Sequence, residues 1–250
     1  MITLSSVFCG FYSMVVSSKA TTPHDFYRAA LLILFAAVFD TLDGRVARMT
    51  KTQSAFGLQL DSLADVMSFG AAPALLLYHW SLSSLGAAGV FACFAFVACG
   101  AVRLARFNVL SMGKNGAPTK PSKYIVGLPT PGAAAVVVSL VAASTAAEGA
   151  FGIQSAARAL MATVVLVAGL MVSNVRFRSF KNLKLNLGTL VVAAFILGSS
   201  ALVMARLSPT FVVVWLVSFY VLVGILEWLW HIPRRLRGKD AAAVTDATDE

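Results

Sequence analysis

The chain has 250 residues, of which 58% are hydrophobic and 12% are charged, and its formal net charge is +9. Soluble domains are about 45–50% apolar and about 25% charged, so this composition excludes an ordinary soluble protein and indicates an integral membrane protein. In such a protein, excess Lys and Arg belong in cytoplasmic loops and near anionic headgroups, so the positive charge does not point to nucleic acid.

Long apolar stretches recur from the first residues to near the C-terminal end. Each approaches the ~20 residues that a helix needs to cross a bilayer. Helices suit these stretches because they satisfy the backbone hydrogen bonds within the segment. The sequence therefore predicts an all-α integral membrane protein of about eight transmembrane helices. The predicted helices cover, to within several residues, 2–18, 25–48, 57–80, 83–107, 124–146, 156–175, 185–206 and 209–231.

The domain organisation is predicted to be simple. Residues 1–206 would form one core with the first seven helices, and residues 207–240 would add the last helix and a basic segment. Residues 241–250 are small and polar, which is typical of a disordered tail.

The basic residues predict the orientation in the membrane. With the N-terminus in the cytoplasm, 16 of the 20 Lys and Arg residues fall in cytoplasmic loops or in the C-terminal segment. The other side has Lys19, Arg28, Arg158 and Arg206. By the positive-inside rule, both termini are expected in the cytoplasm, and the protein in the cytoplasmic membrane.

Four aspartates interrupt the second and third predicted helices near their cytoplasmic ends. Asp40 and Asp43 are three residues apart, and Gly57, Asp61 and Asp65 follow one another at intervals of four. These spacings put each set on one helix face, and a short connection makes the two helices antiparallel neighbours. Four carboxylates at one place would repel each other unless cations intervene. An all-oxygen site of this kind suits Mg²⁺ or Mn²⁺.

Small residues beside the aspartates indicate a ligand. Gly44, Ala47 and Gly57 would let a bulky group lie against the helix backbone, and the guanidinium of Arg48 could bind a phosphate. Alternatively, the aspartates could form an ionic lock with Arg45 and Arg48. Two arginines would neutralise only part of the negative charge of four aspartates. Such a lock would also not explain why small residues lie beside them.

The motif around these aspartates is similar to that of a known family. The chain reads DTLDGRVAR from residue 40, and after eight further residues it reads GLQLDSLAD. This resembles the signature D-x2-D-G-x2-A-R-x8-G-x3-D-x3-D of the CDP-alcohol phosphotransferases at every fixed position. The resemblance implies a membrane enzyme with two divalent cations. In such enzymes an alcohol attacks the phosphate of a CDP-linked lipid, and CMP is released.

The resemblance also implies roles for individual residues. The metal ligands would be Asp40, Asp43, Asp61 and Asp65, with Asp65 also the catalytic base. The nucleotide and diphosphate would be bound by Thr41, Gly44, Ala47, Arg48 and Gly57.

Four further segments resemble the phosphatidylserine synthase branch of that family. They are TLSSVFCGFYS (3–13), AVRLARFNV (101–109), GLPTPGAAA (127–135) and SNVRFRSFK (173–181). That branch implies a six-helix core plus two helices, CDP-diacylglycerol and L-serine as substrates, and by analogy a homodimer. The acceptor or the lipid phosphate would be bound by Arg106, Asn108, Lys123, Ser173, Arg176 and Lys181.

Two other interpretations remain open at this point. Within the family, the acceptor could be glycerol 3-phosphate or inositol phosphate, although their phosphate would favour a denser arginine pocket. In another class, intramembrane aspartates could form the ion path of a cation transporter. A transporter would spread its acids over several helices and depths, whereas these four lie at one level.

Overall fold

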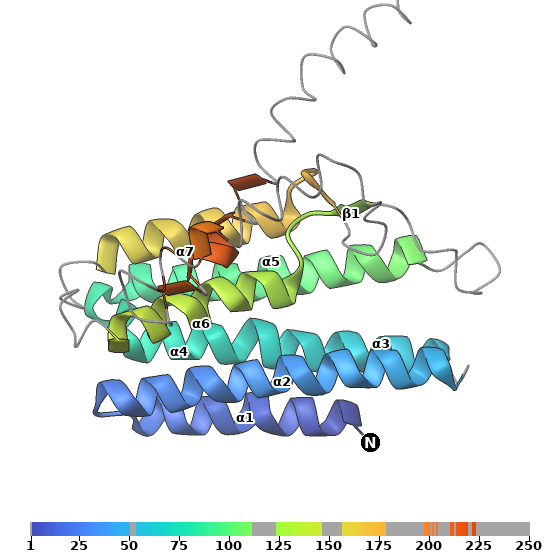
Figure 1. Ribbon diagram of the computed structural model, residues 1–250, viewed down its shortest axis with the longest axis horizontal. Helices are drawn as coiled ribbons and strands as arrows, with labels where there is room; N and C mark the ends of the chain where they lie inside the picture. The colour runs from blue at the N-terminus through green and yellow to red at the C-terminus, as the bar shows by residue number, and fades with distance from the viewer. Residues whose placement is uncertain are drawn as a thin grey trace, which may run out of the picture.

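The computed structural model is an elongated bundle of helices (Figure 1). It describes residues 2–50, 54–111, 124–146 and 157–178, with 198–200, 202, 204, 211–212, 214–219 and 222–223. The helices are α1 (Ile2–Lys19), α2 (Pro23–Met49), α3 (Ala55–Asp65), α4 (Ala72–Trp80), α5 (Ala87–Ser111), α6 (Thr130–Ala146) and α7 (Ala157–Val172). Two short strands, β1 (Tyr124–Val126) and β2 (Arg176–Arg178), pair in antiparallel orientation.

The predicted helical class is confirmed, and the described helices correspond to the first six predicted spans. The span predicted at 57–80 is continuous but not uniform, because the π-helical turn Val66–Ala71 separates α3 from α4. Phe56–Trp80 and Ala87–Val109 are each long and apolar enough to cross a membrane, whereas the apolar helices α6 and α7 are shorter. The spans predicted at 185–206 and 209–231, and the tail 241–250, lie wholly or largely outside the described residues, so the count of eight stays a prediction.

Two predicted helix starts are wrong. The helix expected from residue 83 begins at Ala87, after the 3₁₀ turn Leu82–Leu85. The helix expected from residue 124 begins at Thr130, because residues 124–126 form β1. A proline disfavours helical backbone in the residue before it, so Pro129 makes a helix through Leu128 unfavourable.

A tight connection makes α1 and α2 antiparallel. Thr22 caps α2 by accepting a hydrogen bond from the Asp25 backbone N–H, while the Asp25 carboxylate accepts one from the Thr22 backbone N–H. This capping box begins the helix, and Pro23 occupies its first turn without losing a helical hydrogen bond. Farther along, Ser13 Oγ donates to the Ala29 carbonyl at 2.8 Å. The N-terminus consequently lies at the end of the bundle where α2 stops and α3 begins (Figure 1).

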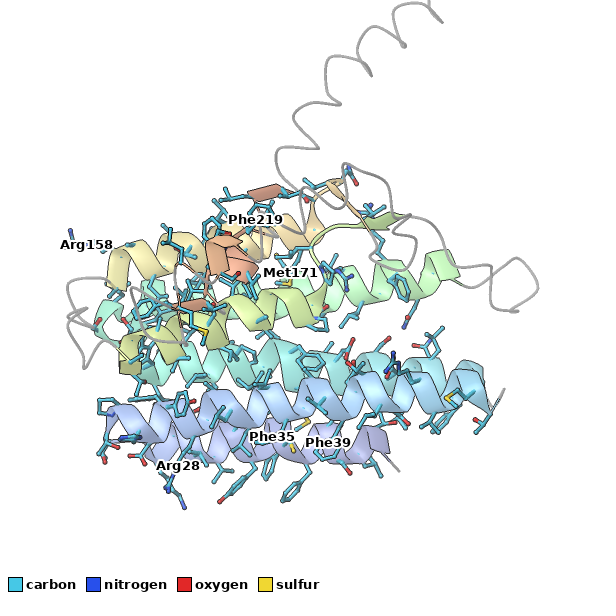
Figure 2. The ribbon with its side chains drawn as sticks, viewed as in Figure 1. Arg28, Phe35, Phe39, Arg158, Met171 and Phe219 are labelled. Carbon is cyan, nitrogen blue, oxygen red and sulfur yellow. The ribbon has the colours of Figure 1, made fainter. Side chains whose placement is uncertain are left out.

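Apolar side chains divide between the interior and the outer surface. The interior packs large residues such as Phe69, Phe96 and Met171 from three different segments. Other large apolar side chains, such as Phe8 and Phe35, are more than half exposed. Exposed apolar surface of this kind suits contact with lipid chains. Arg28 and Arg158 both lie at the end of the bundle away from the N-terminus (Figure 2).

The β1–β2 ribbon and the segment after it are fastened to the end of α7. Tyr124 is opposite Arg178, and Val126 is opposite Arg176. After β1, the Gly127 N–H donates to the Val175 carbonyl at 2.8 Å, and the Leu128 N–H donates to the Leu170 carbonyl at 3.0 Å. Leu170 is in the last turn of α7, where carbonyl groups have no partner within the helix. The segment after β1 therefore provides a partner for the end of that helix.

Replacing Gly127 with Ala is expected to destabilise the protein. Gly127 has φ +78°, and a Cβ there would come within 2.2 Å of the Met171 carbonyl oxygen. The left-handed conformation alone costs a residue with a side chain about 1–2 kcal/mol, and the backbone contact adds to it. We expect the midpoint of thermal unfolding to fall by roughly 5 °C, at about 2–4 °C per kcal/mol for a chain of this size.

Gly169→Ala in α7 is the matched control for Gly127→Ala. Nothing lies within 4 Å of a Cβ at Gly169. Alanine there should leave the unfolding temperature unchanged or raise it, because glycine weakens a helix interior by roughly 0.5–1 kcal/mol. Equal unfolding temperatures for the two variants would contradict the role given to Gly127.

Candidate functional site

The candidate site forms where the C-terminal part of α2 faces the last turns of α3. The α2 backbone closes with the Thr50 N–H donating to the Val46 carbonyl at 2.9 Å. Ser54 then caps α3, with its Oγ accepting from the Gly57 N–H at 3.0 Å. Both helix ends are thus fixed by local hydrogen bonds. The connection between them is short enough for the aspartates of α2 to face those of α3.

The four aspartates act on one another. The carboxyl groups of Asp40 and Asp61 come within hydrogen-bonding distance, although they lie on different helices. The charge of Asp43 acts on both of them, and Asp65 interacts with Asp40 and Asp61. Ionised carboxylates this close repel each other, and a positive charge between them would remove the repulsion.

Helix α1 also contributes to the site. Thr3 is buried, and its Oγ1 donates a hydrogen bond to Asp43 Oδ2. Thr3 is not among the predicted site residues, because a threonine in the first turn of an apolar helix carries no local signal of function. The contact joins residues 40 positions apart and depends on the antiparallel packing of α1 and α2.

Asp65 has a buried carboxylate oxygen that is not hydrogen-bonded. Its Oδ1 is buried and has no hydrogen-bond partner. A buried polar atom without a partner costs about 1–3 kcal/mol, so such an atom in a native fold indicates a ligand or a catalytic role. Asp65 is the last residue of α3, directly before the π-helical turn, and turns of this kind are frequent at functional sites.

Arg103 from α5 brings a positive charge near enough to Asp65 for the two side chains to interact electrostatically. The Arg103 Nη1 also donates to Thr130 Oγ1 at 3.0 Å, and Thr130 is fully buried at the start of α6. Arg103 is not among the residues to which the family resemblance gives a role, and by itself an arginine near a helix end looks like ordinary membrane anchoring. Its position against Asp65 depends on the packing of α5 on α3 and α6.

The residues predicted to bind the nucleotide lie around the same helix ends. Gly44 and Ala47 are partly buried and share a face of α2 with Asp40, whereas Thr41 is exposed and its hydroxyl donates to the Ala37 carbonyl. Gly57 is exposed in the first turn of α3. Arg48 belongs to α2, but its side chain lies outside the described part of the chain.

The residues predicted to bind the acceptor are only partly described. Arg106 donates through Nη1 to the Val172 carbonyl at 3.3 Å and through Nη2 to Asn174 Oδ1 at 2.9 Å. Ser173 donates to the Leu170 carbonyl, and Asn108 makes hydrogen bonds to α3. The backbone of Arg176 is in β2. Its side chain, and the whole of Lys123 and Lys181, lie outside the described residues.

The donor set fits a divalent cation in its chemistry. The four carboxylates offer only oxygen ligands, as Mg²⁺ and Mn²⁺ prefer, and the unpartnered Asp65 Oδ1 is available to one of them. Among the residues that the structure describes, no three His, Cys, Asp or Glu side chains already form a metal-binding group. The carboxylates therefore stand near one another without a closed ligand cage.

The chain is similar to one known protein family along most of its length. The family model described as CDP-alcohol phosphatidyltransferase matches residues 1–173. A protein of Helicobacter pylori (strain ATCC 700392 / 26695), named CDP-diacylglycerol–serine O-phosphatidyltransferase, is 34% identical over 243 residues, which are 97% of this chain and 95% of the relative.

Two relatives with the same name match over shorter regions. The one from Saccharomyces cerevisiae is 42% identical over 143 residues, covering 56% of this chain and 51% of its own length. The one from Methanocaldococcus jannaschii is 45% identical over 107 residues, covering 43% and 47%.

Proposed function

This chain belongs to the CDP-alcohol phosphatidyltransferase family, and we propose that it transfers the phosphatidyl group of CDP-diacylglycerol to the hydroxyl of L-serine. The products are phosphatidylserine and CMP. The observation that carries this proposal is the 34% identity over 97% of the chain to a relative named for that reaction. A cation transporter is no longer a competing interpretation, because the family consists of transferases.

We propose that Asp40, Asp43, Asp61 and Asp65 hold two divalent cations, either Mg²⁺ or Mn²⁺. When bound, these cations would neutralise the diphosphate and stabilise the charge on the attacking and leaving oxygens. The all-oxygen donor set supports this assignment, as does the close approach of Asp40 to Asp61. Around them, Thr41, Gly44, Ala47, Arg48 and Gly57 would accommodate the cytidine and its phosphates.

Asp65 is the proposed general base. Its buried Oδ1 has no hydrogen-bond partner, so it can accept a hydrogen bond from the serine hydroxyl. The hydroxyl oxygen then bonds to the lipid-side phosphorus, and the bond from that phosphorus to the oxygen shared with CMP breaks. CMP leaves with that oxygen, and the hydroxyl proton passes to Asp65. A base within hydrogen-bonding reach contributes about 10²–10⁴ in rate.

The acceptor end of the site is proposed to lie where α5 meets the end of α7. Serine has a carboxylate, which arginine binds well through paired N–H groups. Arg106 already lies there, and the pairing of β1 with β2 brings the segment of Arg176 against residues 124–126. Ser173, Arg176, Lys181 and Lys123 complete the proposed set for the acceptor and the lipid phosphate.

Replacing Arg106 with Ala is expected to raise the KM for serine about tenfold and the KM for CDP-diacylglycerol less than twofold. The reason is that a charge-assisted hydrogen bond contributes about 1.5–3 kcal/mol, of which 1.4 kcal/mol is a factor of ten. The measurement is the initial rate of CMP release with each substrate varied in turn. Ser173→Ala gives a second variant at the same end of α7. Equal increases in both KM values would mean that Arg106 does not bind serine but holds α5 against α7.

The membrane orientation is also a proposal. We place the protein in the cytoplasmic membrane with both termini and the aspartates on the cytoplasmic side. The position of Arg28 and Arg158 at the opposite end of the bundle supports it, since these two belong to the small basic set predicted for the other side (Figure 2).

A substrate panel tests the proposed function. Purified protein in mixed micelles with CDP-diacylglycerol and Mg²⁺ or Mn²⁺ is given serine, glycerol 3-phosphate or inositol phosphate in turn, and CMP release is measured. We expect serine to give the highest kcat/KM. A higher value for either phosphate-bearing acceptor would keep the family chemistry and contradict the choice of serine.

A further inference from the structure

Asn108 joins α5 to α3 beside the aspartates. It is 7% exposed, although its side chain is an amide. Its Nδ2 donates to Gln59 Oε1 at 3.1 Å, and its Oδ1 accepts from Ser62 Oγ at 3.1 Å. Both partners are on α3, and Ser62 directly follows Asp61. The amide group of Asn108 thus makes one hydrogen bond through its nitrogen and one through its oxygen, both to α3.

Helix α3 also packs against α1, but its own side chains bury little apolar surface. Among its described side chains, Ala64 alone is buried, while Phe56 is 77% exposed and Leu63 is 69% exposed. An alanine contributes little packing surface, so the hydrogen bonds to Asn108 add to the packing on α1 in holding this helix. The rest of the span is different, because Phe69, Leu76 and Leu77 are fully buried beyond the π-helical turn.

The rotation of α3 sets the direction of two aspartates. Successive helical residues are about 100° apart, so Ser62 lies about 60° around the helix from Asp65 and about 100° from Asp61. A carboxylate oxygen about 6 Å from the helix axis moves by about 1 Å when the helix turns by about 10°. Functional side chains have to be held within about 0.5 Å of their working positions. A small rotation would therefore disturb any ligand shared by α2 and α3.

We propose that Asn108 is a positioning residue, which holds α3 through Gln59 and Ser62 so that Asp61 and Asp65 face Asp40 and Asp43. This inference deepens the proposed function, and it differs from the expectation that Asn108 binds the acceptor. The two hydrogen bonds turn both ends of this buried amide toward α3, whereas an acceptor ligand would need the amide to face the substrate.

The first variants remove this connection from either side. Asn108→Ala removes the amide, and the double variant Gln59→Ala, Ser62→Ala removes both partners while leaving α5 intact. Gln59 is exposed and Ser62 can donate to the Leu58 carbonyl instead, so Asn108→Ala leaves neither partner buried and unsatisfied. Ser13→Ala is the matched control, since it removes a buried hydrogen bond between helices, from Ser13 Oγ to Ala29.

Mn²⁺ binding without substrates is the direct measurement, by the electron paramagnetic resonance signal of the free ion. Loss of outer partners of a metal site typically weakens binding about 10–100-fold. We expect the Kd for Mn²⁺ to rise about tenfold in Asn108→Ala and in the double variant, and to stay within twofold in Ser13→Ala. An unchanged Kd in Asn108→Ala overturns the proposal. If that variant does not fold, the double variant decides in the same way.

A kinetic measurement separates positioning from acceptor binding. At saturating Mn²⁺, we expect the KM for serine to stay within twofold of the wild-type value in both variants. If the KM for serine rises in Asn108→Ala but not in the double variant, Asn108 binds the acceptor directly. That result would overturn the proposal. If the wild-type protein releases no CMP with serine but its Mn²⁺ binding responds as expected, the proposed function fails and the positioning role stands.

Discussion

Asp61→Asn is expected to reduce metal-dependent CMP release more than about 100-fold, because even outer partners of a metal site are worth about 10–100-fold. Asp61 is central to the cluster, since Asp40, Asp43 and Asp65 all interact with its carboxylate. An amide in that place has lost the negative charge that attracts a cation. The rate should therefore fall at every Mg²⁺ or Mn²⁺ concentration in a titration.

The fold should tolerate this substitution. Removing one of several repelling carboxylates relieves unfavourable charge, so the thermal unfolding temperature without metal should stay the same or rise. Asp25→Asn is the matched control, because it makes the same chemical change at the other end of α2, in the capping box with Thr22. That control should retain its activity. Metal-stimulated CMP release at the wild-type rate in Asp61→Asn would contradict the assignment of the aspartates to the cations.

Asp65→Asn is expected to lower kcat by about 10²–10⁴ with little loss of CDP-diacylglycerol binding. The substitution keeps the shape of the side chain and one carbonyl oxygen, but an amide does not accept the proton of the serine hydroxyl at neutral pH. The measurement is paired: turnover with serine, and titration of the nucleotide lipid in Mg²⁺. The change in kcat and the unchanged affinity together identify a base.

Two results would contradict the role of Asp65. If turnover falls only as far as CDP-diacylglycerol binding falls, Asp65 acts first as a metal ligand. If turnover hardly changes, the proton leaves the serine hydroxyl by another route, such as the substrate phosphate.

The features that the sequence predicts correctly are local ones. Helices α1 and α2 follow from unbroken apolar stretches, and a turn of few residues makes them antiparallel. The spacing of Asp40 with Asp43, and of Asp61 with Asp65, reports which side chains share a helix face. These inferences need only helical periodicity and short connections, so a single sequence is sufficient for them.

The features that the sequence does not predict depend on packing between distant segments. Thr3 reaches Asp43, and Arg103 comes near enough to Asp65 to interact with its charge, only because α1 and α5 pack against α2 and α3. The pairing of β1 with β2 joins segments about 50 residues apart, and strands of three residues are too short to show alternation. Asn108 illustrates the difference most directly. Its amide looks suited to a substrate in the sequence, and in the structure its hydrogen bonds go to Gln59.

The most direct test of the proposed reaction follows one oxygen atom. Purified protein is given CDP-diacylglycerol, Mg²⁺ and L-serine labelled with ¹⁸O in its hydroxyl group, and both products are analysed by mass spectrometry. Attack of the serine hydroxyl on the lipid-side phosphorus predicts labelled phosphatidylserine and an equal amount of unlabelled CMP. Label in CMP, or CMP release without phosphatidylserine, would contradict this account.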